Sequence, residues 1–91
     1  MASGASPDYT ILFARSARNE LERLPSKFAM RILRRIERLA LNPRPRGSRK
    51  LAGCENLWRI RVGEYRVIYA IDDSQRIVDI SVVRHRRDAY L

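Results

Sequence analysis

The sequence predicts an α+β fold in which a two-helix hairpin packs on a largely antiparallel four-stranded sheet. Three observations support this prediction: a β-rich segment at residues 9–13, two segments with helical periodicity before residue 43, and three β-rich segments after residue 56. The order β-α-α-β-β-β is typical of domains whose helices lie on one side of an antiparallel sheet. At 91 residues, the chain has the length of one domain. We expect a single domain at residues 9–91, preceded by a flexible segment at residues 1–8.

The two helices are predicted from the spacing of apolar residues. After the first strand, the apolar period becomes helical until Pro25, which ends the first helix. Ser26 is expected to cap the second helix, which ends before Asn42-Pro43. Its other face is basic, and this face is either a phosphate-tracking surface or an ordinary solvated one. The basic residues are Lys27, Arg31, Arg34, Arg35 and Arg38.

The second half of the chain is predicted to be a basic loop followed by three strands. Two prolines and two glycines in residues 42–53 favour a loop, which carries Arg44, Arg46, Arg49 and Lys50. Strands are expected at residues 57–62, 65–72 and 77–83 because these segments are β-branched or alternate in polarity.

The Gly63-Glu64 turn predicts how the first two of these strands pair. A two-residue hairpin loop with Gly first suits a type II′ turn and sets Val62 opposite Tyr65. Arg61 then lies opposite Arg66, and Arg59 shares the same face, while the alternate residues point to the core. Like charges opposite each other destabilise a strand pair, so the three arginines are expected to bind an anion. The alternative is an ordinary solvated sheet face.

The charge of the chain supports an anionic partner. Nineteen Lys and Arg against ten Asp and Glu give a formal net charge of +9. Only Lys27 and Lys50 are lysines, and arginine suits bidentate recognition of phosphate. Nucleic acid is the first candidate partner and an acidic protein the second.

Other functional classes are disfavoured by residue types. The one cysteine, Cys54, cannot form an internal disulfide, and no Cys/His cluster has metal-ligand spacing. We therefore expect a cytoplasmic protein with no metal and no cofactor. No segment has the ~20 apolar residues of a membrane span, and the N-terminal residues do not form a secretory signal.

The C-terminal segment is dense in chemically active side chains. It holds Arg84, Arg86 and Arg87, the only histidine, His85, and Tyr90. Histidine can exchange a proton near neutral pH, and tyrosine can stack on a base or carry a proton. The alternative is a basic tail that Tyr90 pins to the core.

In four stretches, the chain resembles the RelE/ParE toxin superfamily. The resemblance extends from Tyr9 to Tyr90, and the order and spacing of the stretches make it specific. They are residues 9–13 with Ala17 and the helix end at 21–25, residues 39–43, residues 50–53 leading into 57–69, and residues 85–90.

The resemblance implies a microbial RNase-like fold and, for the RelE branch, cleavage of messenger RNA in the ribosomal A site. In that branch the ribose 2′-OH attacks the adjacent phosphorus, which restricts the substrate to RNA. By position, the catalytic residues implied are Arg59, Arg61, Arg66, Arg84 and Tyr90. Arginine stays protonated at biological pH, so Arg61 is a poor general base, and we expect His85 to transfer the proton.

The resemblance also implies the partners. We expect an acidic antitoxin in a hetero-oligomer, and contact with operator DNA only through that antitoxin. Basic residues outside the catalytic set are expected to contact RNA or the ribosome. They are Arg31, Arg35, Arg38, Arg46, Arg49, Lys50, Arg86 and Arg87.

Two other functions compete with RNA cleavage. ParE-type relatives share the scaffold but inhibit DNA gyrase without nuclease chemistry, and a fold alone does not separate the two. We favour the nuclease because a gyrase inhibitor has no evident need for converging arginines. A plain nucleic-acid-binding module ranks third, because the chain has no recognisable helix-turn-helix.

Overall fold

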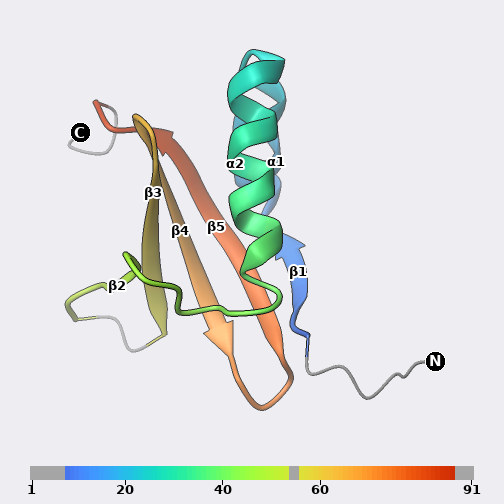
Figure 1. Cartoon of the computed structure of the whole chain (residues 1–91), viewed down its shortest axis with the longest axis vertical. Helices are drawn as coiled ribbons and strands as arrows, with labels where there is room; N and C mark the ends of the chain where they lie inside the picture. Colours follow the sequence, from blue (N-terminus) through green and yellow to red (C-terminus); the bar gives the residue numbers. More distant parts are fainter. Residues whose placement is uncertain (1–7, 54–55, 88–91) are drawn as a thin grey trace.

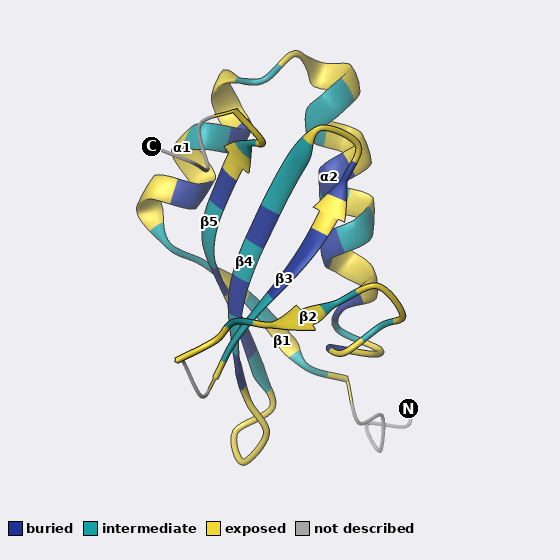
Figure 2. Ribbon diagram, turned by 90° about the vertical axis from the view of Figure 1, so that its left-hand side faces the viewer, coloured by how far each residue is buried: buried dark blue, intermediate teal, exposed yellow. Residues whose placement is uncertain are grey.

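The computed structural model describes residues 8–53 and 56–87. Two helices and five strands make up the fold (Figure 1). They are β1 (Thr10–Phe13), α1 (Arg15–Arg23), α2 (Ser26–Arg38), β2 (Arg49–Lys50), β3 (Leu57–Val62), β4 (Tyr65–Asp72) and β5 (Ile77–His85). Both helices lie on one face of the sheet (Figure 1), and Figure 2 looks onto the opposite face, in front of which no helix lies. The predicted α+β class is confirmed, and the predicted elements occur in the predicted order, with one additional short strand, β2, between α2 and β3.

The sheet has five strands in the order β1-β5-β4-β3-β2. β1 runs parallel to β5, whereas the other pairs are antiparallel. The predicted number of four strands is wrong, because Arg49 and Lys50 pair with Arg59 and Trp58 at the edge of the sheet. These two residues follow the prolines and precede Gly53, so a short ladder fits between residues that interrupt regular structure.

The start of α2 differs from the prediction. Ser26 is the first residue of the helix and not its cap. Pro25 takes the capping position in an extended conformation, with no side-chain hydrogen bond. Its carbonyl accepts the first helical bonds, from the backbone N–H groups of Phe28 and Ala29 at 3.0 and 3.1 Å. Proline has a backbone carbonyl but no N–H, so it can begin a helix that it could not continue.

The core lies between the sheet and the helices. α1 contributes Ala17 and Leu21, and α2 contributes Ile32 and Ile36. The sheet contributes alternate residues of its three long strands, which appear as dark segments along the ribbons in Figure 2. These residues are Ile60, Val62, Val67, Tyr69, Ile71, Val78, Ile80 and Val83.

Side-chain bonds fix the connector between α2 and β2. The buried Tyr69 hydroxyl donates a hydrogen bond to the Pro43 carbonyl at 2.7 Å. Arg44 binds both carboxylate oxygens of Asp73, at 3.2 and 2.8 Å, and Tyr9 donates to the same carboxylate at 2.6 Å. The connector is therefore tied to β4, to the β4–β5 turn and to the start of β1, and these ties place β2 at the sheet edge.

Two further expectations concern the N-terminal segment and membrane-spanning helices. Residues 1–7 of the expected flexible segment lie outside the described residues. Neither described helix is long and apolar enough to cross a membrane.

Candidate phosphate-binding site on the uncovered sheet face

The Gly63-Glu64 turn sets the register of the site. Val62 pairs with Tyr65 and Arg61 with Arg66, as the two-residue turn predicts. Gly63 has a φ of +60°, which glycine adopts without the strain that a side chain would add. Glu64 is not among the described residues with positive φ, as a type II′ turn requires.

The register aligns arginines across three strands. Arg61 on β3 pairs with Arg66 on β4, which pairs in turn with Arg84 on β5. We call these three residues the arginine row. Their neighbours along each strand, such as Val62, Val67 and Val83, are buried beneath the helices, so the row lies on the uncovered face. Adjacent strands are about 4.8 Å apart, which brings three guanidinium groups within reach of one phosphate.

Arg59 lies one step further along the same face. It pairs with Arg49 on β2 and with Ile68 on β4, and only 9% of its surface is exposed. Arg61 and Arg84, by contrast, are exposed, and Arg66 is half-buried. The row is thus the accessible part of the predicted cluster, and Arg59 is its buried part.

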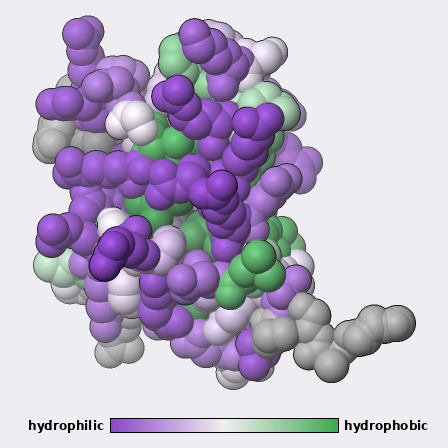
Figure 3. Space-filling view, viewed as in Figure 1, coloured by the Kyte–Doolittle hydropathy of each residue, from purple (hydrophilic) through white to green (hydrophobic). Residues whose placement is uncertain are grey.

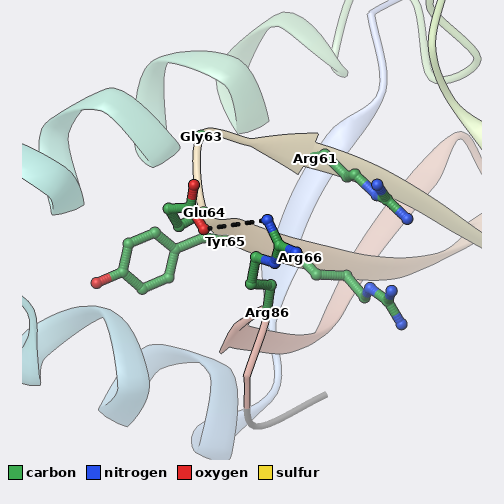
Figure 4. A pocket seen from close by; sticks show the side chains of 6 residues that line it. All are labelled: Arg61, Gly63, Glu64, Tyr65, Arg66 and Arg86. Carbon is green, nitrogen blue, oxygen red and sulfur yellow. Dashed lines mark ion pairs between the residues drawn. The ribbon is translucent and has the colours of Figure 1, made fainter. Parts of the chain in front are cut away.

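A small cavity of about 110 Å³ adjoins the row at the turn. Figure 4 shows Arg61 and Arg66 extending in the same direction from neighbouring strands, while Arg86 turns toward Glu64. Arg86 pairs with the Glu64 carboxylate at 3.5 Å, and its backbone N–H donates to the Glu64 carbonyl at 2.7 Å. These contacts hold the segment after β5 against the turn, so a fourth arginine joins the site.

The acidic side chains of the sheet lie away from the row. Asp72 and Asp79 are at the other end of β4 and β5, near the β4–β5 turn. The uncovered face is therefore positive at the β3–β4 turn and negative at the opposite end. This separation concentrates positive potential where the arginines converge.

His85 lies on the opposite side of the sheet from the row. It pairs with Tyr65, and their rings meet edge to face at 5.2 Å. Its Nδ1 accepts a hydrogen bond from the backbone N–H of Arg87 at 3.2 Å, so in the neutral ring the proton is on Nε2. His85 and the row thus lie on opposite sides of the sheet, whereas the sequence alone groups them together. Tyr90 lies outside the described residues.

The remaining basic residues with predicted RNA contacts are spread over four regions. Arg31, Arg35 and Arg38 lie on one side of α2, with Arg31 at the β3–β4 turn, where its Nη1 is 3.4 Å from the position a Gly63 Cβ would occupy. Hydrophilic side chains cover most of the face that includes α2 (Figure 3). The others are exposed on the connector, on β2 and after β5: Arg46, Arg49, Lys50 and Arg87.

Two residues of the site did not stand out in the sequence. Glu64 supplies the carboxylate of the cavity, and its position in the two-residue turn was the available signal. Arg44 fixes the connector through Asp73 and also lies over the Trp58 ring at 5.2 Å. Nothing in the local pattern distinguishes Arg44 from the exposed arginines around it.

The chemistry of the site is that of anion binding. Among the described residues, no three His, Cys, Asp or Glu side chains are grouped so that they could hold a metal ion. Guanidinium groups in a fixed row can bind phosphate oxygens and stabilise negative charge that develops on them.

Comparison with known proteins shows the family. Residues 11–90 match the model described as the ParE toxin of type II toxin–antitoxin system, parDE. Toxin RelE of Mycobacterium tuberculosis is 34% identical over 83 residues, which cover 90% of this chain and 86% of that protein. Toxin RelG of the same organism is 35% identical over 86 residues, covering 90% and 95%. The crystal structure of the archaeal RelE–RelB complex from Pyrococcus horikoshii has a TM-score of 0.78 at 28% identity, covering 87% of this chain and 96% of that one. The chain therefore belongs to the ParE toxin family of type II toxin–antitoxin systems, within the RelE/ParE superfamily.

Proposed function

We propose that this toxin is an endoribonuclease that cleaves messenger RNA in the ribosomal A site and thereby inhibits translation. The arginine row is the observation that carries the proposal. Three guanidinium groups are held in register on one accessible face, and the strands that hold them are fixed by the sheet ladder and the core. Such preorganisation is what electrostatic stabilisation of a transition state requires.

In the proposed reaction, the ribose 2′-oxygen attacks the adjacent phosphorus. A bond forms between the 2′-oxygen and phosphorus, and the bond from phosphorus to the 5′-oxygen breaks. The 2′-hydroxyl loses a proton and the leaving 5′-oxygen gains one, so the products are a 2′,3′-cyclic phosphate and a 5′-hydroxyl. Arg61, Arg66 and Arg84 neutralise the negative charge that accumulates on the phosphate oxygens. The buried Arg59 positions the row and adds to its potential.

The position of His85 argues against it as the proton acceptor. His85 faces the helices, and its Nδ1 already accepts a bond from Arg87. We assign the transfer to Tyr90 or to a phosphate oxygen of the substrate. His85→Gln tests this assignment: cleavage with an unchanged pH profile is expected, whereas loss of the profile's acidic limb, where a proton acceptor becomes protonated, would return the role to His85.

The proposed partners follow from charge and from the relatives. The similar archaeal toxin was solved in complex with RelB, and a basic surface suits an acidic antitoxin. We propose that such an antitoxin forms a hetero-oligomer with this toxin, covers the arginine row, and supplies any contact with operator DNA. The exposed basic residues of α2, the connector and β2, together with Arg87, would contact ribosomal RNA in the cytoplasm.

Inhibition of DNA gyrase is the second candidate, because residues 11–90 match a ParE toxin model and the resemblance to ParE-type toxins implies this activity. It would use the same scaffold as a binding surface, with no need for the row.

The test compares the two candidates in parallel reactions. Purified toxin is added to ribosomes programmed with a defined messenger, to the free messenger, and to a gyrase supercoiling reaction. We expect cuts within the A-site codon, reduced by about 10² or more in Arg61→Ala and in Arg66→Ala. Arg23→Ala, which removes the same charge from the exposed end of α1, is the matched control and should cut normally. Intact messenger with blocked supercoiling would establish the gyrase candidate instead.

A further inference from the structure

A second cavity lies across the β3–β4 turn from the arginine row. It has a volume of about 430 Å³, within the range of small-ligand sites. Phe28, Tyr65 and His85 line it together with Arg31 and Glu64. Gly63, Glu64 and Tyr65 line both this cavity and the small one beside the row, so the two adjoin at the turn.

The walls of this cavity are aromatic. The Tyr65 ring meets Phe28 at a centroid distance of 5.9 Å with a tilt of 43°, and meets His85 at 5.2 Å, edge to face. Rings in these arrangements cover each other's faces less than a parallel stack does. All three residues are half-buried. Aromatic faces beside a cationic groove are the surfaces on which single-stranded nucleic acids stack their bases.

The rim of the cavity carries one donor group and one acceptor group. The Arg31 guanidinium lies over the turn, at 3.4 Å from the position of a Gly63 Cβ. Glu64 follows Gly63 in the chain. Its carboxylate forms an ion pair with Arg86 at 3.5 Å, and both side chains are more than 60% exposed. An exposed ion pair of this length is weak, so the carboxylate can accept hydrogen bonds from a ligand.

We propose that this cavity binds a nucleobase of the RNA, with a preference for guanine. This inference rests on the proposed function, since it places the base of a nucleotide whose phosphate meets the arginine row. Arg31 donates to guanine O6 and N7, the pair of acceptors that arginine recognises bidentately. Glu64 accepts from the N1–H and N2–H groups on the other edge. Tyr65 and His85 provide the stacking surface, which gives His85 a binding role in place of proton transfer.

The first experiment measures base selectivity without cleavage. The full chain is titrated with GMP, AMP, CMP and UMP, and binding is followed by NMR. We expect GMP to bind at least about fivefold more tightly than CMP, with shifts of the His85 and Tyr65 ring resonances. Equal affinities for the four nucleotides, or ring resonances that do not move, would overturn the inference.

Two variants of α2 separate base recognition from charge. Arg31→Gln should abolish the GMP-to-CMP affinity ratio, while Arg38→Gln, with the same loss of charge seven residues along the helix, should keep it. A loss of affinity shared equally by all nucleotides in Arg31→Gln would mean that Arg31 reads only phosphate, and would refute the guanine contact.

Cleavage mapping on programmed ribosomes distinguishes this inference from the proposed function. Selective GMP binding by a protein that leaves messenger intact would support the base site and refute the nuclease. Cleavage of messenger by a protein that shows no base preference in the titration would support the nuclease and refute the base site.

Discussion

Tyr69→Phe removes a single buried hydroxyl and tests how the connector is held. Tyr69 has 0% of its surface exposed, and its hydroxyl donates to the Pro43 carbonyl at 2.7 Å. Pro43 is itself buried, so water cannot readily replace the lost donor. Leaving a buried acceptor unsatisfied costs about 1–3 kcal/mol, and the partial exposure of the neighbouring connector places our expectation at about 1–2 kcal/mol.

Urea denaturation followed by the fluorescence of Trp58 measures this loss. The denaturation midpoint should fall while the slope stays constant, because the surface exposed on unfolding does not change. In thermal melts, each kcal/mol corresponds to roughly 4–8 °C for a domain of this size. Tyr9→Phe is the control, since its hydroxyl bond to Asp73 is exposed and water can take its place, with an expected loss of about 0.5 kcal/mol or less.

The same variant has a signature at high pH. Burial raises the pKa of Tyr69 to about 12, and a hydrogen bond with Ser48 offsets part of this increase. A group whose pKa is raised in the folded state contributes stability that is fully present below its unfolded pKa, here about 10. This stability is lost as the pH rises toward 12. The wild type should therefore lose more stability than Tyr69→Phe over this interval. Equal losses, together with a Tyr69→Phe cost no larger than that of Tyr9→Phe, would refute a buried connector bond.

Three further perturbations address the network, the turn and the row. Hydrogen bonds from Arg44 and then Tyr9 lower the pKa of Asp73 to about 2, so its contribution is present above about pH 4 and lost as pH falls toward 2; melting temperatures of Asp73→Asn should vary less than those of the wild type between these values. Gly63→Ala should cost about 1–2 kcal/mol in urea denaturation because of the positive φ, and Gly63→Asn should cost less. Arg61→Gln should stabilise the free protein by roughly 0.2–1 kcal/mol at low salt by relieving like-charge pairing, and a gain that is independent of salt would contradict this cause.

The hairpin register was predictable because it depends on local information. A two-residue turn with Gly first leaves one pairing for the flanking residues, and the alternation of Ile60 and Val62 with Arg59 and Arg61 leaves one choice of inner face. The pairing of Arg66 with Arg84 could not be predicted in this way. It depends on the four residues between β4 and β5 and on a register shift at Ile68/Tyr69.

The differences between the predicted and the observed positions of the site residues arise from long-range geometry. Adjacency to Arg84 in the sequence groups His85 with the arginines, yet neighbouring residues in a strand point to opposite faces, and β5 continues through His85. The sequence predicts a strand that ends at residue 83, so it does not indicate that Arg84 and His85 point to opposite faces. Arg49 joined the sheet because the connector is fixed by Tyr69 and Asp73, which are 26 and 29 residues from their partners. No periodicity within the connector could reveal those contacts.

The positions of the two groups of basic residues explain why we assign catalysis to the sheet and docking to α2 and the connector. The side chains of Arg61, Arg66 and Arg84 start from strands fixed by a ladder and by the core, so binding a phosphate orders little more than the side chains themselves. Ordering an exposed long side chain costs about 0.5–1.5 kcal/mol. Arg35, Arg38 and Arg46 start from a helix and a loop and not from paired strands of the sheet, so we expect them to pay this cost when they bind. Their attraction for RNA is therefore broad and dependent on salt, whereas the row can act at one defined atom. The like-charge repulsion within the row decreases when an anion binds, which couples the stability of the protein to substrate or to an acidic antitoxin.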